Sequence, residues 1–376
     1  MMHWNLRVVC LVGAALASAC SGAPDLDGID PTSLTTTTIT NTKAPFTTAA
    51  VITTDYAVYS LATVDLDSGE VTDEITTMPN AAMIKRLEDG RLYNYNQLGT
   101  DTVRVYAPDS WSAPLLEWSV GDGSMNPHDV ALCGEQLFVS LYGGTTIDVY
   151  NPSTGAFSGA VDMSAFDDGD GLPEIDDLAC VDDMLYATVQ QLDRNNGWTA
   201  NGGALVQIDP LTLNAEKSWY VGSNPTLQIH PSIPGTLIIN TGVYYEADGG
   251  ISMFDTASET LTSLLVSEKD LNMDIVGFVT NMADHAIVIG ASLEDFGDTY
   301  ALYCVDMRDW SVSWKEDLGL FVIGAHANDR GEAYLLGRTH WDYPEVPGAL
   351  EVWDIENCEQ TTSYGFSLDP YSLAFY

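Results

Sequence analysis

The stretch FDDGDGLPEIDD, residues 166–177, places six acidic side chains and two glycines within twelve residues. Calcium takes six to eight hard oxygen ligands from carboxylates, carbonyls and water, and glycine lets a chain turn sharply around the ion. Like charges this close together repel one another unless water or a cation neutralises them. We therefore interpret the stretch as a Ca²⁺ loop, with a solvated acidic turn as the alternative. The carboxylates that we expect to bind the ion are Asp167, Asp168, Asp170, Glu174 and Asp176.

This loop does not follow the helix-loop-helix calcium pattern. If Gly171 takes the glycine position of that pattern, Phe166 falls where the first Asp belongs, and no helix flanks the loop. The stretch is more similar to the short Asp-Gly-Asp-Gly calcium turns of extracellular bacterial proteins. That resemblance implies a cation that stabilises the folded chain.

His128, in the segment NPHDV, is a candidate for acid–base chemistry. A general base needs a partner that orients it near the reacting atom. The adjacent Asp129 does not provide one, because neighbouring side chains in a strand point to opposite faces. An alternative catalytic set adds Glu174 and His340, although nothing in the sequence requires these residues to meet. We expect His128 to be structural, and the protein to bind a ligand rather than transform it.

Two long loops carry aromatic side chains, residues 190–203 (QQLDRNNGWTANGG) and residues 338–348 (RTHWDYPEVPG). Aromatic, Arg and Asn side chains are common in binding surfaces. We expect these loops to bind a protein or glycan ligand. The alternative is that their rings fold back over the neighbouring strands. The residues that we expect to contact the ligand are Arg194, Asn195, Trp198, Trp341 and Tyr343.

An internal repeat supplies the elements that must position these residues. Similar strand-like runs recur at spacings of 42, 44, 58, 46, 51 and 48 residues, as ATVDLDSGEV, TVRVYAPDSW, TIDVYNPSTG, ALVQIDPLTL, GISMFDTASE, ALYCVDMRDW and ALEVWDIENC. Alternating runs lie on either side of each, with Gly, Asp, Asn and Pro between them, which is typical of antiparallel strands and hairpins. Seven units of four strands at this spacing predict an all-β fold, a seven-bladed β-propeller with four-stranded antiparallel blades.

Both ends of the repeat fit a closed ring. Residues 48–77 supply only three strands, so we expect the final DPYSLAFY to complete the first blade and cover both sheet edges. The repeat resembles seven-bladed propellers of the lactonase-like and surface-repeat kind over residues 48–376. This resemblance implies His and acidic residues at the starts of the innermost strands. Because propellers host unrelated functions, the alternative to binding is a lactonase-like hydrolase or lyase at the channel mouth around His128.

Four cysteines lie in the repeat region, an even number that suits an oxidising compartment. Cys133 and Cys180 fall on the innermost strands of neighbouring blades. Cys304 falls on a third strand, and Cys358 follows the third strand of the next blade. We expect both pairs to form disulfides between blades, with buried free thiols as the alternative.

The first twenty residues, MMHWNLRVVCLVGAALASAC, are typical of an export signal, because one cation precedes an apolar run and small residues. The run is too short to span a membrane. Residues 16–20 resemble a bacterial lipoprotein signal, which implies that Cys20 is lipidated, although Ala17 stands where a large aliphatic residue is usual. Secretion with cleavage nearby is the alternative. We expect a signal peptide at residues 1–19, a flexible Thr/Ser/Pro-rich tether at 20–47 and the propeller at 48–376.

The chain is very acidic, with 54 Asp and Glu against 13 Lys and Arg and a formal net charge of −41. This charge disfavours nucleic acid and anionic membrane surfaces as partners. Hydrophobic residues make up 45% of the chain, enough for a folded core. Ser21 after the cysteine resembles lipoproteins that reach an outer membrane. We expect an exported monomer, anchored in the cell envelope by lipid alone, that meets an envelope protein, a peptide or a glycan.

Overall fold

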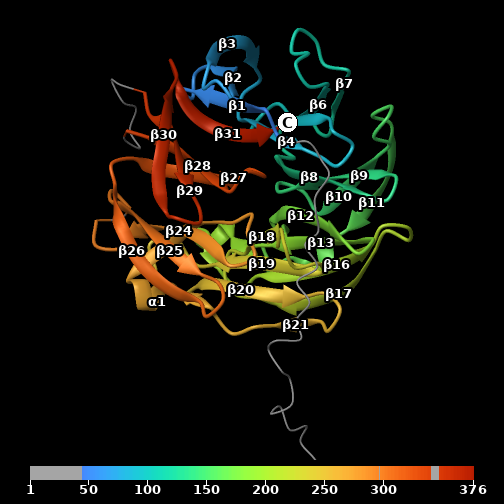
Figure 1. Cartoon of the computed structure of the whole chain (residues 1–376). Coiled ribbons are helices and arrows are strands. Elements are labelled where there is room, and N and C mark those ends of the chain that lie inside the picture. The colour runs from blue at the N-terminus through green and yellow to red at the C-terminus, as the bar shows by residue number, and fades with distance from the viewer. Residues whose placement is uncertain (1–44, 296, 340–346) are drawn as a thin grey trace, which may run out of the picture. The chain divides into compact units, whose positions relative to one another are not determined.

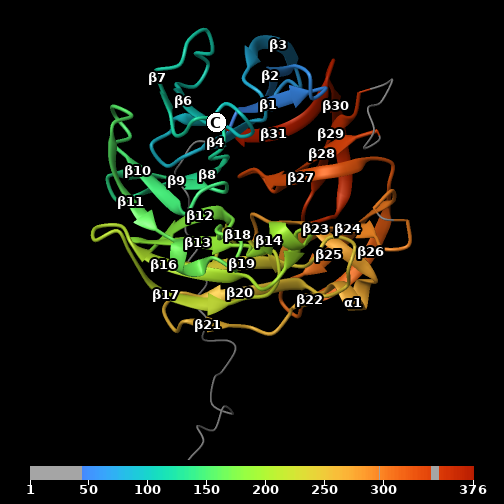
Figure 2. The same ribbon diagram turned by 180° about the vertical axis from the view of Figure 1, so that it is seen from behind.

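A closed ring of seven blades is built by the unit that spans Pro45–Tyr376 (Figures 1 and 2). The computed structural model describes residues 45–295, 297–339 and 347–376. Within these ranges, no helix is long and apolar enough to cross a membrane. The all-β fold and the seven four-stranded antiparallel blades predicted from the repeat are confirmed.

Each of blades 1 to 4 has four strands, which follow one another from the channel outwards. Blade 1 contains β31 (Asp369–Phe375), β1 (Thr48–Thr54), β2 (Tyr59–Asp65) and β3 (Val71–Met78). Blade 2 contains β4 (Ala82–Arg86), β5 (Leu92–Asn96), β6 (Thr102–Tyr106) and β7 (Leu116–Ser119). Blade 3 contains β8 (Pro127–Cys133), β9 (Gln136–Leu141), β10 (Thr146–Tyr150) and β11 (Phe157–Asp162). Blade 4 contains β12 (Ile175–Val181), β13 (Met184–Val189), β16 (Ala204–Asp209) and β17 (Asn214–Tyr220), and a small hairpin of β14 (Leu192–Asp193) and β15 (Thr199–Ala200) lies beside it.

Blades 5 to 7 follow the same plan. Blade 5 contains β18 (Thr226–Ile229), β19 (Thr236–Thr241) and β20 (Gly250–Asp255), and its outer strand is divided into β21 (Thr260–Leu261) and β22 (Val266–Ser267). Blade 6 contains β23 (Met273–Val279), β24 (His285–Ser292), β25 (Tyr300–Asp306) and β26 (Ser311–Leu318). Blade 7 contains β27 (Phe321–Ala327), β28 (Glu332–Arg338), β29 (Ala349–Asp354) and β30 (Glu359–Gly365). The described helical segments are α1 (Glu268–Leu271) and 3₁₀ turns at Ser164–Phe166 and Arg194–Asn196.

The ring closes where the C-terminal strand joins the first blade. β31 pairs antiparallel with β1, from Ala49 opposite Phe375 to Thr54 opposite Asp369. The sequence prediction that the last strand completes the first blade is therefore confirmed. Closure pairs β31 with the edge of β1, so another chain cannot add a strand to β1 at the seam.

Apolar side chains of adjacent blades pack face to face and form the core. Between blades 3 and 4, for example, Phe138 and Ile147 lie in one buried cluster with Leu185 and Val206. Burying a side chain of this kind contributes about 1.5–3 kcal/mol. The outermost strands behave differently, since most residues of β17 and β30 are exposed. The alternating pattern in the sequence therefore reflects burial between blades, while the rim remains polar.

A left-handed backbone residue precedes the innermost strand in several blades. The φ angles of Ala81, Asn126, Glu174, Asn224 and Asn272 lie between 47° and 55°. In three of these blades, the carbonyl of this residue accepts the N–H at the end of the second strand, as Glu174 does from Gln190. Asn tolerates this conformation well, whereas a residue such as Glu adopts it at a cost on the order of 1 kcal/mol. The turn thus fixes where each inner strand begins, at one mouth of the central channel.

Two disulfides connect neighbouring blades. The structure joins Cys133 to Cys180, with Cα atoms 5.3 Å apart, and Cys304 to Cys358, with Cα atoms 6.0 Å apart. The first links the inner strands of blades 3 and 4, and the second links blades 6 and 7. The pairs expected from the sequence are the pairs that the structure brings together. Each bridge restricts the unfolded chain and so favours the folded ring.

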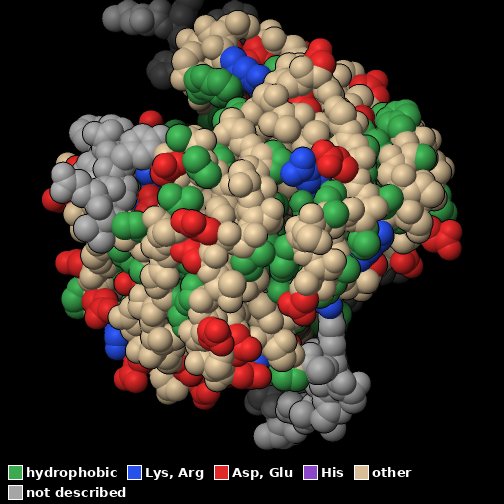
Figure 3. Space-filling view, turned by 90° about the horizontal axis from the view of Figure 1, so that it is seen from above, with side chains coloured by type: hydrophobic (Ala, Val, Ile, Leu, Met, Phe, Trp, Pro, Cys, Tyr) green, Lys and Arg blue, Asp and Glu red, His purple; other side chains and the backbone are tan. Residues whose placement is uncertain are grey.

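Charged side chains are scattered over the surface, and most of them are acidic (Figure 3). Acidic side chains are spread over the face seen in Figure 3, and Lys and Arg side chains lie singly among them. The described residues of this face in Figure 3 therefore form no extended basic surface for a polyanion.

Candidate functional site

The candidate site lies on one face of the ring, which carries the starts of the innermost strands and the loops between the second and third strands. We call it the long-loop face. His128, the second residue of β8, and Asp176, the second residue of β12, occupy equivalent places in adjacent blades. Their Nδ1 and Oδ1 atoms are 2.5 Å apart. The acidic partner of His128 is therefore a residue of the next blade.

Gln190 and Tyr142 extend this contact. The Gln190 amide donates to Asp176 Oδ2 at 2.5 Å, and the Tyr142 hydroxyl donates to Gln190 Oε1 at 2.8 Å. The Tyr142 ring stacks on the His128 ring, with centroids 4.2 Å apart and an interplanar angle of 22°. Burial raises the pKa of the Tyr142 hydroxyl, and the negative charge of Asp176 raises it further. The hydroxyl therefore stays protonated and serves as a hydrogen-bond donor.

Arg194 fastens the loop 190–203 to this cluster. Its Nε donates to the fully buried carboxylate of Glu174 at 2.8 Å, and its Nη2 donates to the Tyr142 carbonyl at 2.9 Å. The guanidinium also lies over the rings of Tyr142 and Trp198, at 5.5 and 4.9 Å from their centroids. Burial raises the pKa of Glu174 to about 7, against the opposing effect of the Leu192 N–H and Arg194. Arg194 is thus occupied in holding the loop.

Three exposed rings lie on the same face of the ring as the cluster. Trp198, whose backbone has a φ of 65°, is 54% exposed, Tyr244 is 67% exposed and Tyr245 is 44% exposed. The surrounding protein raises the pKa of the Tyr244 hydroxyl, and the negative charge of Asp176 raises it further, so this tyrosine lies near the cluster. We call Trp198, Tyr244 and Tyr245 the aromatic rim. The exposed Asn195 lies in the same loop as Trp198, and Asp193 Oδ1 accepts its backbone N–H at 3.0 Å.

The cluster opens into a central cavity of about 760 Å³ to which all seven blades contribute. His128 and Asp176 line it together with an ion pair between Lys85 Nζ and Asp129 Oδ2 at 2.7 Å. Burial raises the pKa of Asp177 well above its usual range, and the nearby Asp176 and Asp129 raise it further. Burial also lowers the pKa of His326 to about 4, helped by the positive charge of Lys85. The channel therefore presents neutral and charged hydrogen-bonding groups in a confined space.

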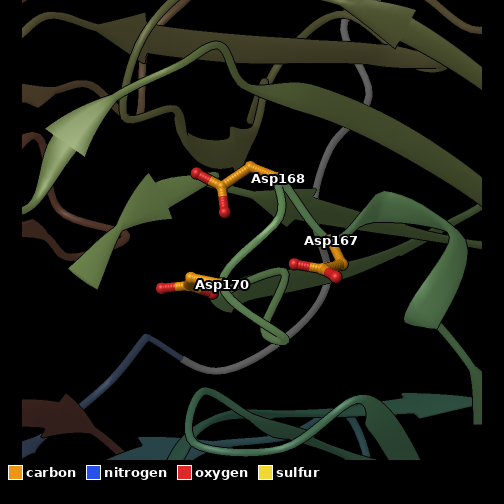
Figure 4. Close-up of side chains that lie close together, drawn as sticks. All are labelled: Asp167, Asp168 and Asp170. Atoms are coloured by element: carbon orange, nitrogen blue, oxygen red, sulfur yellow. The ribbon is translucent and has the colours of Figure 1, made fainter. Parts of the chain in front are cut away.

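The acidic loop lies close to the same face, but its carboxylates divide into two groups. Ligand atoms of Asp167, Asp168 and Asp170 lie within 4.8 Å of one another around one turn (Figure 4). Asp167 Oδ1 accepts the N–H groups of Gly169 and Gly171, and both glycines have positive φ. Glu174 and Asp176 are instead directed to Arg194 and His128.

Asp168 differs from the other carboxylates of this loop. Its Oδ2 accepts from Asn201 at 2.9 Å, whereas its buried Oδ1 has no hydrogen-bond partner among the described residues. Asp170 uses both oxygens for backbone N–H groups, those of Leu172 and Arg194. The three carboxylates could supply ligands to a cation, and Asp168 Oδ1 is a buried oxygen among them that accepts no hydrogen bond from the described residues.

Some predicted residues fall outside the described residues, namely Cys20, His340, Trp341 and Tyr343. Within the described part, the structure brings Arg194, Trp198, Glu174 and His128 into a single site. Sequence reasoning missed Tyr142, Gln190 and the Tyr244–Tyr245 pair. These residues share a position in the blade repeat that could have identified them. Each lies at or just after the end of a second strand, on the same face as the loop 190–203.

The fold and this site define the molecule as a seven-bladed β-propeller with a polar cluster at its channel mouth. No protein-family model matches the chain, and no curated protein matches it. Among solved structures, it is similar to a Bacteroides fragilis protein assigned as a 6-phosphogluconolactonase, with 14% identity over 89% of this chain and 99% of that chain and a TM-score of 0.61.

Two further solved structures show the same architecture. A chain of the mitotic checkpoint complex has 13% identity, a TM-score of 0.57 and coverage of 82% of this chain and 87% of that chain. Streptogramin B lyase has 10% identity, a TM-score of 0.53 and coverage of 78% and 91% respectively. At these identities the likeness establishes the propeller fold alone.

The raised pKa of Glu174 predicts a pH dependence of stability. Between about pH 4.5, its ordinary pKa, and about pH 7, folded Glu174 keeps a proton that the unfolded chain releases. Its contribution to the free energy of unfolding is therefore present at low pH and is lost as the pH rises through 7. In Glu174→Gln, which cannot titrate, the loss of stability between pH 4.5 and pH 8 should be smaller by roughly 1 kcal/mol or more.

Urea unfolding at both pH values measures this difference. Glu216→Gln, at an exposed position of β17, is the control and should retain the wild-type pH dependence. Equal pH dependence in Glu174→Gln and the wild type would contradict the assignment.

Proposed function

We propose that the protein binds a protein or glycan ligand at its long-loop face, over the mouth of the central channel. The observation that carries the proposal is the aromatic rim, whose exposed rings lie beside a polar cluster built from two blades. Trp and Tyr side chains that expose large rings on a rigid support are frequent anchors of binding sites. Because Arg194 is held by Glu174 and Tyr142, the rings and the channel-mouth polar groups would make the direct contacts.

A second candidate is a hydrolase or lyase at the same channel mouth. The contact between His128 Nδ1 and Asp176 Oδ1 favours it, because an orienting carboxylate is what a histidine base requires. Glu174, part of the alternative catalytic set, is buried under Arg194 and supports the loop in this arrangement.

Calcium would stabilise the propeller through the acidic loop. The support is the proximity of Asp167, Asp168 and Asp170, together with the unpartnered Asp168 Oδ1. Hard carboxylate oxygens suit Ca²⁺, and backbone carbonyls and water would have to complete its coordination. The same loop supports Arg194 through Asp170, so the ion would steady the site without taking part in chemistry.

The anchoring of the protein is a separate part of the proposal. Residues 1–19 would direct export, and Cys20 would carry lipid in the cell envelope, at the outer membrane of a two-membrane bacterium. Two buried acyl chains give a stable anchor, and residues 20–47 would act as the tether.

The binding proposal predicts a difference between two exposed tryptophans. Trp198→Ala should weaken ligand capture about tenfold or more, because truncation of an aromatic anchor costs roughly 2 kcal/mol. Trp314→Ala on β26, where the side chain is 59% exposed, is the matched control and should bind normally. Pull-down from envelope extract and a glycan array, each followed by titration, provide the measurement. Equal binding by the two variants would place the ligand elsewhere.

The calcium proposal predicts a ligand-dependent melting temperature. Millimolar Ca²⁺ should raise the melting temperature of the wild type by a few degrees relative to chelator, because the ion binds only the folded state. Asp168→Asn should lose most of this increase. Asp183→Asn, an exposed carboxylate outside the loop, makes the same change in charge and should keep it. An equal increase in all three proteins would mean that the ions act on the acidic surface in general.

The anchor is tested by metabolic labelling with a fatty acid. The wild type should incorporate the label, and Cys20→Ser should not. Cys10→Ser, within the same export signal, should be labelled as the wild type is. Label in Cys20→Ser would refute lipidation at this cysteine.

A further inference from the structure

Three carboxylates of blades 3 and 4 line the central cavity, and one of them keeps an unused oxygen. Lys85 Nζ donates to both oxygens of Asp129, at 2.8 and 2.7 Å, and Asp176 has a contact on each of its oxygens. Asp177, the third residue of β12, accepts the Leu227 N–H on Oδ2 at 2.7 Å. Its Oδ1 accepts no hydrogen bond from the described residues, and no Lys or Arg among them pairs with it. Asp177 therefore keeps an unused acceptor at the wall of the channel.

Tyr95, on β5, contributes a second unused group to the same wall. Its side chain lines the cavity and is 6% exposed, yet its hydroxyl makes no hydrogen bond to the described residues. Burial raises the pKa of this hydroxyl, and the negative charges of Asp129, Asp177 and Asp176 raise it further, so it lies near all three carboxylates. Leaving a buried hydroxyl without a partner is costly, so this group favours a ligand that can hydrogen-bond to it.

His326, on β27, adds an acceptor to the channel without adding a charge. Its ring makes no hydrogen bond to the described residues, and it lines a smaller pocket together with Asp177. Its pKa of about 4 leaves the ring neutral near pH 7, with one nitrogen as an acceptor. Arg86 also lines the cavity, but it ends β4, away from the long-loop face, and its guanidinium lies over the Phe46 ring. The unused groups around Asp177 therefore call for a donor that carries positive charge.

A metal ion does not suit this arrangement. A hard cation takes several oxygens at close range. Within the described part of the chain, the His, Cys, Asp and Glu side chains that bring three ligand atoms within 4.8 Å of one another are those of Asp167, Asp168 and Asp170, in the acidic loop. A primary ammonium group carries one positive charge on three N–H donors. It requires one carboxylate, and its other donors can reach acceptors that point in different directions.

We propose that the central channel binds a small molecule that carries a primary ammonium group, with Asp177 Oδ1 as its carboxylate partner and the Tyr95 hydroxyl as a further acceptor. The cavity of about 760 Å³ has the size of a small-molecule site. Burial, Asp176 and Asp129 together raise the pKa of Asp177, whereas a positive charge beside Oδ1 would favour its ionised form. This site goes beyond the proposed function, because Trp198 is not among the residues that line the cavity.

Three probes of similar size test the chemistry of the ligand. Binding to the full-length protein is measured by saturation-transfer NMR titration at neutral pH in physiological salt, which screens the acidic surface. Butylamine is protonated under these conditions, butan-1-ol lacks the charge, and butyltrimethylammonium has the charge without an N–H donor. We expect saturable binding of butylamine and binding at least about tenfold weaker for the other two probes, because a charge-assisted hydrogen bond needs both the charge and the donor.

Two substitutions test the position of the site. Asp177→Asn removes the charge and keeps an oxygen for the Leu227 N–H, and it should weaken butylamine binding about tenfold or more. Tyr95→Phe removes only the hydroxyl and should weaken binding about threefold or more. Asp183→Asn makes the same change in charge at an exposed position and should bind as the wild type does. Circular dichroism verifies that each variant is folded.

Butylamine binding that both channel substitutions weaken, and that Asp183→Asn does not, supports the inference. Absence of butylamine binding by the wild type overturns it. Binding that is unchanged in either Asp177→Asn or Tyr95→Phe, or that butyltrimethylammonium equals, also overturns it. If Asp177→Asn does not fold, Tyr95→Phe decides the result. Trp198→Ala should retain butylamine binding, so failure of the channel site and failure of the proposed function are distinguishable.

Discussion

The pairing of β31 with β1 holds the ring closed, and every inward-facing contact of the site depends on that closure. A single four-stranded blade cannot bury both of its faces, so each blade is stabilised by its two neighbours. Once the ring is closed, the innermost strands are held side by side around one axis. His128 on β8 and Asp176 on β12 meet because their strands begin at the same level, and the left-handed residue before each strand fixes that level.

The site is therefore a product of two neighbouring blades. Blade 3 supplies His128 and Tyr142, blade 4 supplies Asp176, Gln190 and the loop that carries Arg194 and Trp198, and blade 5 adds the exposed Tyr244. Glu174 has two roles, one in its backbone and one in its side chain. Its backbone makes the turn before β12, and its buried carboxylate holds Arg194. Because Glu174 has both roles, its left-handed backbone conformation is kept beside the site although that conformation costs energy.

Much of the fold could be predicted from the sequence, because alternation of apolar residues and the spacing of turns are local signals that repeat seven times. The disulfide partners could be proposed for the same reason, since the repeat places cysteines in adjacent blades. Single members of the site, including His128, Glu174, Arg194 and Trp198, could also be named. Their assembly could not, because it depends on contacts between repeats. Asp176 lies 48 residues after His128, and only the alignment of two blades brings the pair together.

Sequence alone also could not show which carboxylates of the acidic loop lie together. Along the sequence, Glu174 and Asp176 are indistinguishable from Asp167 or Asp170 as carboxylates near a turn. In the structure the chain passes into β12 at Glu174, so alternate side chains turn away from the loop toward Arg194 and the channel. Local composition predicts which groups are present, whereas strand direction decides which of them share a surface.

The two disulfides reinforce some contacts between neighbouring blades and leave the closure of the ring without a covalent link. Blades 3 and 4 are covalently joined, as are blades 6 and 7, whereas the closing pair of strands in blade 1 is held by hydrogen bonds and packing alone. If the chain were pulled from its two ends, tension would act first on β1 and β31, because they are the terminal strands of the ring. The residues enclosed by each disulfide could not be drawn out. The ring would open at its seam, and the pulled chain would stay shorter than a fully extended one because each disulfide still closes a loop. Under mechanical load the weakest contact of the ring is therefore the closure that creates the channel.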